Sequence, residues 1–219
     1  MAGRMPPWRV GEYLYMTITM IWLKFLVIWR IARAWALLEG IVPPENMTRC
    51  ISNTYSLTVF WRGWHASFNQ WLVRYLYVPL GGGQRRVLNG LLTFLFVAYW
   101  HDLEWKLLVW GLLNGGFLAT EAAAAAFYRS ERWQWFIKKP YFSHLAAFCI
   151  GVYLILVIIG NLVGYHVGVN GSVDIVKQLF FSVAGWAFLG VASAVVGAVV
   201  RLMFFLEDLK AAWGGGKTC

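Results

Sequence analysis

Four long apolar blocks constrain this chain more than any other feature of its sequence. They cover residues 13–29, 107–127, 142–163 and 179–206. A helix of about 20 apolar residues crosses the roughly 30 Å of hydrocarbon in a bilayer, so each block approaches the length of a transmembrane helix. A fifth block at 87–100 covers only about 21 Å, so we expect it to be short, tilted or re-entrant. The blocks therefore predict an all-α, multi-pass membrane protein.

The distribution of charge predicts how these blocks are oriented. The chain of 219 residues is 60% hydrophobic and 13% charged, with a formal net charge of +9. Its basic residues lie in short stretches between apolar blocks, without the basic face or motif of a nucleic-acid-binding protein. By the positive-inside rule, we expect the basic clusters within 84–86 and 129–139 to be cytoplasmic. His101 and the stretch 164–177, which we expect to be a loop, then lie on the lumenal side.

The stretch between residues 43 and 83 is neither a spanning block nor a simple loop. Arginines alternate there with tryptophans and tyrosines, a pattern typical of amphipathic helices at a membrane surface. Gly81-Gly82-Gly83 lacks the Lys-Ser/Thr that follows a phosphate-binding loop, so we interpret it as a flexible break between two helices. A second triplet, Gly214-Gly215-Gly216, predicts a frayed tail.

The cysteines predict no cross-linked or metal-bound framework. Cys50, Cys149 and Cys219 are odd in number and lack the spacing of metal ligands, which supports neither a disulfide scaffold nor a zinc site. Cys149 lies within an apolar block, so we expect it in the core.

Two histidines in tryptophan-rich sequence are the main candidates for chemistry. An imidazole changes its charge near neutral pH, so a histidine in or beside a spanning segment suggests a functional site. His101 ends the short fifth block after Trp100, and His65 follows Trp64 in the aromatic stretch. Structural roles stay open for both: His101 as a ring at a helix end bonded to a backbone carbonyl, and His65 as a surface residue.

Four motifs lie between residues 44 and 102: Pro44-Glu45-Asn46-Met47-Thr48-Arg49-Cys50, Phe60-Trp61-Arg62-Gly63-Trp64-His65, the run Trp-Leu-Val-Arg-Tyr-Leu-Tyr-Val-Pro-Leu-Gly-Gly over 71–82, and Tyr99-Trp100-His101-Asp102. Together they closely resemble the membrane-bound O-acyltransferase family, in the branch of the glycerol-uptake proteins and hedgehog acyltransferase. The resemblance runs from about Leu37 to Lys210 and is most specific over 44–121.

The resemblance implies a transfer of a fatty acyl group from acyl-CoA to a hydroxyl or amine, with acyl-CoA as the donor substrate and no metal or other cofactor. His101 falls on the catalytic histidine of the family. His65 falls on its second polar position, which His, Asn or Asp occupies elsewhere. An imidazole base suits this chemistry because an alcohol is a weak nucleophile near neutral pH.

The resemblance also suggests roles for five charged residues. Four arginines lie on the expected cytoplasmic side, where they would bind either the phosphates of acyl-CoA or the membrane surface: Arg62, Arg74, Arg85 and Arg86. Glu121 aligns with a glutamate of the branch, and we expect it to be structural or to line the acyl tunnel.

The whole chain would then be the C-terminal part of a helical tunnel, with a membrane domain at 1–210 and a flexible tail at 211–219. Family members are about twice as long, so we expect a fragment, a truncated gene model or a reduced paralogue, with the missing N-terminal half as a partner. The resemblance implies a lipid acceptor in the endoplasmic reticulum membrane, namely a lyso-glycosylphosphatidylinositol anchor. The alternative is a non-enzymatic membrane protein that affects glycerol uptake or protein lipidation.

Overall fold

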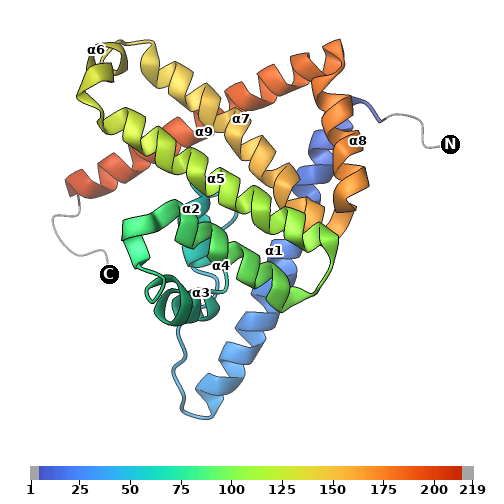
Figure 1. Ribbon diagram of the computed structural model, residues 1–219, viewed down its shortest axis with the longest axis vertical. Coiled ribbons are helices and arrows are strands. Elements are labelled where there is room, and N and C mark those ends of the chain that lie inside the picture. The colour runs from blue at the N-terminus through green and yellow to red at the C-terminus, as the bar shows by residue number, and fades with distance from the viewer. Residues whose placement is uncertain (1–4, 214–219) are drawn as a thin grey trace.

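A computed structural model describes residues 5–213, and this part of the chain is helical without a β-strand, as the apolar blocks predict (Figure 1). Its long helices are α1 (Pro7–Leu38), α4 (Arg86–His101), α5 (Trp105–Arg129), α7 (Phe142–Leu162), α8 (Gly168–Phe180) and α9 (Val183–Trp213). Shorter helices are α2 (Leu57–Gly63), α3 (Ala66–Leu72) and α6 (Gln134–Ile137). The π-helical turns are η1 (Val73–Tyr77) and η4 (Val163–Val167), and the 3₁₀ turns are η2 (Gly82–Arg85) and η3 (Glu131–Trp133).

Four helical segments in the described part are long and apolar enough to cross a membrane: α1, α5, the continuous stretch from α7 to α8, and α9. The first three each contain a whole apolar block, and α9 contains the block at 179–206 from Val183 onward. The 16-residue helix α4 is about 24 Å long, which agrees with a short fifth block. The protein is therefore an integral membrane protein, and the shorter helix α4 packs against the spanning helix α5.

The expected loop at 164–177 is wrong. Helix α7 passes through η4 into α8, and Gly168, with a φ of 72°, marks the bend between them. Polar residues such as Asp174 make the stretch read as a loop, but they leave an apolar helical face that buries Leu179. The last spanning helix consequently begins at Val183 rather than at residue 179.

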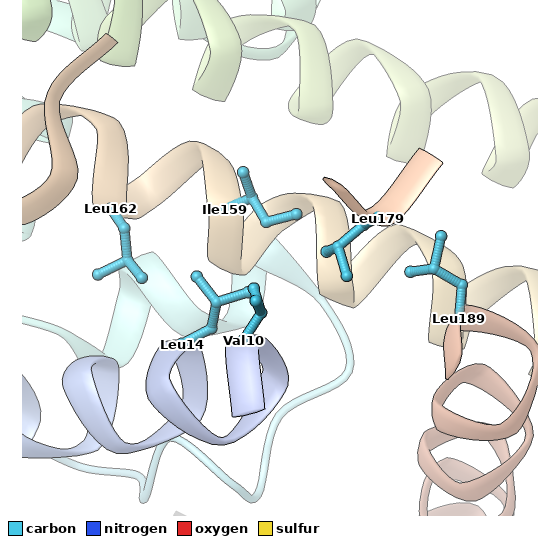
Figure 2. Close-up of a cluster of buried hydrophobic side chains, with 6 residues drawn as sticks. All are labelled: Val10, Leu14, Ile159, Leu162, Leu179 and Leu189. Carbon is cyan, nitrogen blue, oxygen red and sulfur yellow. The ribbon is translucent and has the colours of Figure 1, made fainter. Parts of the chain in front are cut away.

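One apolar cluster joins the first helix to the last three (Figure 2). Its fully buried members are Val10 and Leu14 of α1, Ile159 and Leu162 of α7, Leu179 of α8 and Leu189 of α9. Leu179 has no exposed surface and Leu162 only 1%. The N-terminal end of α1 therefore lies with α8 and the C-terminal end of α7.

Two glycines let α7 and α9 approach closely. A Cβ at Gly151 would lie 2.3 Å from the backbone oxygen of Ser193, and a Cβ at Gly197 would lie 2.6 Å from that of Ala147. Small residues at helix crossings are typical of membrane proteins, because backbones that approach closely gain packing that lipid cannot supply.

The segment from α3 to η1 runs antiparallel to α4. Phe68 near the start of α3 lies against Trp100 near the end of α4, with ring centroids 4.6 Å apart, and Trp71 lies against Phe96 at 6.1 Å. Gly81 and Gly82, with φ of 104° and 54°, reverse the chain between them. This confirms the glycine triplet as a break between helices.

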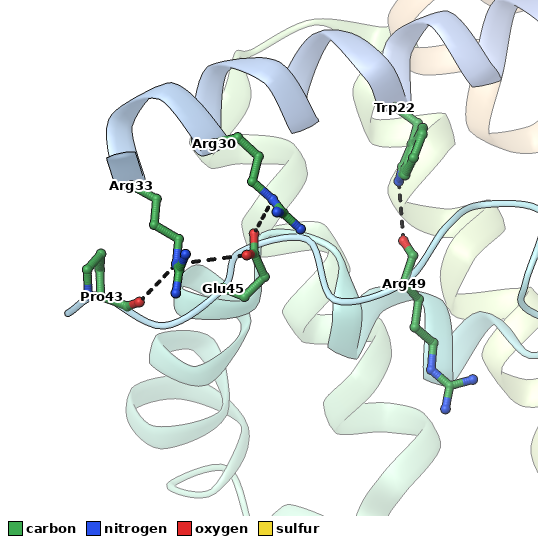
Figure 3. Close-up of polar contacts among 6 residues, drawn as sticks. All are labelled: Trp22, Arg30, Arg33, Pro43, Glu45 and Arg49. Carbon is green, nitrogen blue, oxygen red and sulfur yellow. Dashed lines mark hydrogen bonds and ion pairs between the residues drawn. The ribbon is translucent and has the colours of Figure 1, made fainter. Parts of the chain in front are cut away.

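The extended stretch after α1 is tied back to that helix (Figure 3). The Glu45 carboxylate pairs with Arg30 (3.1 Å) and Arg33 (3.8 Å), and the Trp22 indole N–H donates to the backbone oxygen of Arg49 (3.3 Å). These contacts hold residues 43–49 beside α1, and this stretch in turn positions the candidate site.

Cys149 does not lie where the sequence predicts. Cys149 is exposed on α7 rather than in the core, because the inner face of that helix is taken by residues such as Ala147 and Gly151. Helix α9 continues to Trp213. Cys219 and Gly214-Gly215-Gly216 lie outside the described residues.

Candidate active site

His65 lies in a backbone turn between α2 and α3. Its φ of 47° and ψ of 55° are left-handed, and among residues 5–213 no other residue except glycine has a positive φ. Histidine, asparagine and aspartate tolerate this region better than other side chains. An unusual backbone conformation at a candidate catalytic residue supports a functional role, because the surrounding structure must hold it in place.

Residues 46–48 hold that turn. The backbone N–H of Ala66 donates to the Asn46 carbonyl (3.0 Å), and the N–H of Ser67 donates to the Asn46 side-chain oxygen (2.9 Å). Thr48 N–H donates to the carbonyl of Gly63 (3.1 Å). Asn46 thus provides the cap that His65 does not provide for α3. The His65 side chain is consequently free for another partner.

His101 is the last residue of α4, where the chain turns into extended backbone at Asp102. As expected for a neighbour in sequence, the Asp102 carboxylate does not face the imidazole, because it accepts a hydrogen bond from the N–H of Leu103 (2.7 Å). Aromatic rings flank His101, which keeps part of its surface exposed: its centroid lies 4.8 Å from Trp100, 5.3 Å from Tyr165 and 6.5 Å from Trp110.

Both imidazoles face one cavity of about 1260 Å³. A chain of rings connects them: His65 lies 5.3 Å from Phe68, which lies 4.6 Å from Trp100, the ring beside His101. Binding sites for drug-sized ligands occupy roughly 300–1,000 Å³, so this cavity is large for a small molecule. Its walls come from α1 to α5, α7 and α9 and are mostly apolar and aromatic.

The structure brings the two histidines to one cavity. The sequence places His101 at the lumenal end of the short block and leaves His65 open between a surface role and a functional one. The antiparallel return of α3 along α4 is the reason that the two face the same cavity. The aromatic residues that resemble a membrane-surface belt, such as Trp61, pack inward against Trp110 (5.7 Å).

The surroundings favour the neutral form of both rings, which lie outside the four spanning segments. Burial lowers the pKa of both imidazoles. For His101, repulsion from His65 lowers the pKa further. Within the described residues, no protein side chain is hydrogen-bonded to either imidazole. Each can therefore accept a proton from a bound substrate.

The structure separates the four candidate arginines into two pairs. Arg62 and Arg86 line the cavity, whereas Arg74 and Arg85 are exposed and do not line it. Lys24, which lies within an apolar block of α1, also lines the cavity. Two arginines and one lysine therefore give the cavity its cationic groups.

Buried amides fix two of the aromatic walls. The Trp61 indole donates to the Asn114 oxygen (3.1 Å), and the Trp110 indole donates to the Asn161 oxygen (3.0 Å). The Asn114 amide donates in turn to the Trp110 carbonyl (2.9 Å). Asn114 is 0% and Trp110 1% exposed. Bonded indoles cannot rotate without leaving a buried polar group unpaired, so these walls are held in place.

Tyr165 is the cavity residue that sequence reasoning missed most clearly. It lies on η4, within the stretch that reads as a loop, and its ring stands edge-on to both His101 (5.3 Å) and Trp110 (5.4 Å). Single π-helical turns inside longer helices occur often at functional sites. That irregularity is visible only in the folded chain.

Glu121 does not line the cavity in the structure. Its carboxylate instead accepts hydrogen bonds from the start of α2 and from Tyr153. Of the two roles that the sequence leaves open, the contacts support the structural one.

Comparison with known proteins places these motifs in a family. Residues 8–160 match the membrane-bound O-acyltransferase family, MBOAT. Membrane-bound O-acyltransferase GUP1 of Millerozyma farinosa is 37% identical over 214 residues, which cover 97% of this chain and 41% of that protein. GUP1 of Saccharomyces cerevisiae is 39% identical over 202 residues, or 92% of this chain and 35% of that protein.

A mammalian relative matches about half of the chain. Protein-cysteine N-palmitoyltransferase HHAT of Mus musculus is 35% identical over 111 residues, which cover 49% of this chain and 22% of that protein. The chain spans less than half the length of these relatives. The family match begins at residue 8, within α1 and earlier than the expected start near residue 37. The chain belongs to the membrane-bound O-acyltransferase family, in the branch that contains the GUP1 proteins and HHAT.

Proposed function

We propose that this chain transfers a long-chain acyl group from acyl-CoA to a hydroxyl group of a lipid acceptor. The observation that carries the proposal is the convergence of His65 and His101 on one large, mostly apolar cavity. Such a cavity suits an acyl chain, and a neutral imidazole suits the base that an alcohol nucleophile requires.

In the proposed reaction, His101 takes the proton of the acceptor hydroxyl as the oxygen attacks the thioester carbonyl carbon. The new C–O bond forms, the C–S bond then breaks, and the imidazolium returns the proton to the departing CoA thiolate. The step conserves electrons and protons, so it requires the acyl-CoA donor and the acceptor and no further cofactor. His65 would donate a hydrogen bond to the oxyanion or orient the acceptor.

The cationic residues suggest where the donor lies. Arg62, Arg86 and Lys24 line the cavity and would bind the phosphates of CoA, because guanidinium groups match phosphate geometry. Arg74 and Arg85 lie away from the cavity, so we propose that they contact the membrane surface instead.

The finer assignment follows the branch to which the chain belongs. We propose a lyso-glycosylphosphatidylinositol anchor as acceptor and the endoplasmic reticulum as location, with the remaining part of a full-length family fold as a partner where the chain is expressed alone. These points rest on the branch alone.

The test is transfer of labelled palmitoyl from palmitoyl-CoA to lyso-glycosylphosphatidylinositol or lysophospholipid in isolated membranes. It compares the chain, the same chain with any coding sequence upstream of Met1, His101→Ala, and His144→Ala as a matched control. His144 bonds to Arg201 (2.7 Å) and does not line the cavity. We expect His101→Ala to reduce transfer about 10²- to 10⁴-fold and His144→Ala to retain it.

Absence of His101-dependent transfer in every form would overturn the enzymatic proposal. A binding role in glycerol uptake or protein lipidation would then stand in its place. Equal transfer to both acceptors would retain the enzymatic proposal but remove the anchor-lipid assignment.

A further inference from the structure

We propose that Glu121 is a positioning residue for His65, acting through α2. This inference rests on the proposed function, because it concerns how the second histidine is placed against the first. Glu121 lies on the spanning helix α5, where a carboxylate needs a reason to be retained. It makes no contact with the cavity, so its effect must be indirect.

The Glu121 carboxylate accepts hydrogen bonds from the first turn of α2. It accepts hydrogen bonds from the Ser56 hydroxyl (3.1 Å), the Thr58 N–H (3.2 Å), the Thr58 hydroxyl (2.7 Å) and the Leu57 N–H. Tyr153 of α7 adds its hydroxyl (3.2 Å). The first N–H groups of a helix have no partner within it, and a negative charge there also complements the helix dipole.

A second hydrogen bond joins α2 to α5 about one helical turn further along α2. Trp61 donates its indole N–H to Asn114 (3.1 Å), which precedes Glu121 by seven residues on α5. Residues seven apart share a face of a helix, so α2 is bound along one face of α5 at two separate points. Two anchors prevent α2 from both sliding along α5 and rotating on it.

The position of α2 determines that of His65. Helix α2 ends at Gly63, and only Trp64 separates it from His65. On the other side of His65, Asn46 caps α3. The left-handed turn is therefore held from both directions, by Glu121 through α2 and by Asn46 through α3. A displacement of about 1 Å at a catalytic group can cost about 10²-fold in rate.

Glutamate suits this role better than its amide. An ionised carboxylate accepts on both oxygens, whereas glutamine has one acceptor oxygen and would turn an NH₂ group toward the donors of α2. Glu121→Gln should therefore release the start of α2 while retaining the shape and volume of the side chain. Glu131→Gln is the matched control, because Glu131 is exposed in η3 and does not line the cavity.

Kinetics on the full chain in membranes distinguish positioning from a general loss of folded protein. We expect Glu121→Gln to lower kcat per folded molecule about 10- to 100-fold with little change in the KM for palmitoyl-CoA. Glu131→Gln should change neither. A lower amount of folded protein with unchanged kcat and KM would overturn the proposal.

A double-mutant cycle tests whether the effect passes through His65. Once His65→Ala has removed the imidazole, Glu121→Gln should cause little further loss of kcat. Losses that multiply would show that Glu121 acts elsewhere and would overturn the proposal. If Glu121→Gln does not fold, Tyr153→Phe removes a single hydrogen bond to the same carboxylate and enters the cycle in its place.

A measurement independent of activity separates this inference from the proposed function. Diethyl pyrocarbonate modifies accessible neutral imidazoles, and mass spectrometry follows His65 and His101 in the same sample. Glu121→Gln should change the modification rate of His65 several-fold and leave that of His101 unchanged. Unchanged His65 reactivity would overturn the positioning role. Inactive wild-type protein with altered His65 reactivity would instead overturn the enzymatic proposal while retaining the control of His65 by Glu121.

Discussion

The backbone at His65 restricts which residues this position accepts. A side chain in the left-handed region brings its Cβ close to the following carbonyl oxygen, at a cost of roughly 1–2 kcal/mol. His, Asn and Asp, the residues that the family resemblance places here, are those that tolerate it best. Backbone conformation and chemistry therefore select the same small set of side chains.

Replacements of His65 separate the two requirements. We expect His65→Val to lower the free energy of unfolding in detergent by about 1–2 kcal/mol relative to His65→Asn, because a branched Cβ is strained in this region. Both variants lose the imidazole, so the difference reports on the backbone alone. Equal stability of the two variants, measured by chemical unfolding, would show that the left-handed turn imposes no such cost.

The two imidazoles also predict a dependence on pH. Burial lowers the pKa of both rings, and repulsion from His65 lowers that of His101 further. A lowered pKa means that the neutral, proton-accepting form persists below the ordinary value of about 6.5. As pH falls, kcat/KM should therefore begin to decrease only below about 6.5.

Removal of one imidazole gives the control for this profile. In His65→Asn the repulsion is absent, so the pKa of His101 should rise toward its ordinary value and the acid limb of kcat/KM should move to higher pH. Rates measured between about pH 5 and 8 test this. A limb that stays in place, or moves to lower pH, would contradict the assignment of His101 as the base.

Hydrogen bonds between helices also fix the positions of the groups that form the site. Helix α2 is bound to α5 through Glu121 and Asn114, and α5 is bound to α7 through the Trp110–Asn161 hydrogen bond. Polar groups within spanning helices are costly unless they are paired, and here each amide holds an aromatic wall of the cavity. The polar residues of the spanning helices thus hold in place the apolar and aromatic residues that line the cavity.

The crossing of α7 and α9 gives a prediction about stability. Gly151→Ala would place a methyl group 2.3 Å from the Ser193 backbone oxygen, which a rigid backbone cannot avoid, so we expect a loss of about 1–3 kcal/mol. Gly116→Ala on α5 has no atom within 4 Å of the new Cβ and should be neutral or stabilising by up to about 1 kcal/mol. Thermal unfolding in detergent compares the two variants, and a similar stability would show that α7 and α9 can separate at little cost.

The molecule as a whole builds its cavity from helices that are distant in sequence. Its lining extends from Tyr15 of α1 to Met203 of α9. Helix α5 places the turn at 102–104, beside His101, at one end and the basic turn at 130–141 at the other (Figure 1). The basic turn contains one of the two clusters that the positive-inside rule assigns to the cytoplasm.

This arrangement predicts the orientation of the protein in the membrane. In a background without Cys50, Cys149 and Cys219, a membrane-impermeant maleimide added to sealed microsomes should label Glu131→Cys. Glu104→Cys should become labelled only after the membrane is permeabilised, because it lies beyond the opposite end of α5. The reverse pattern would invert the topology and place the entrance for CoA on the other face.

Local composition was sufficient for the number and placement of the spanning helices. A helix in lipid satisfies its backbone within itself, so a long apolar block almost determines the element that it forms. The short α4 could be predicted for the same reason, and the break before it could be predicted because glycine adopts positive φ at little cost. Residues 164–177 could not, because α8 owes its form to burial of Leu179 against α1, α7 and α9.

The meeting of His65 and His101 was decided by tertiary structure. Motifs identified both residues, but the sequence left His65 open between a surface role and a functional one and gave no sign of how close it lies to His101. What joins them is a left-handed turn, the cap from Asn46 and the return of α3 along α4. The cap and the return of α3 are contacts between residues far apart in the chain, and the turn at His65 is held by the first of them, so composition and periodicity carry no signal of this arrangement. The inward role of Trp61, the exposure of Cys149 and the hold of Glu121 on α2 depend on the same packing.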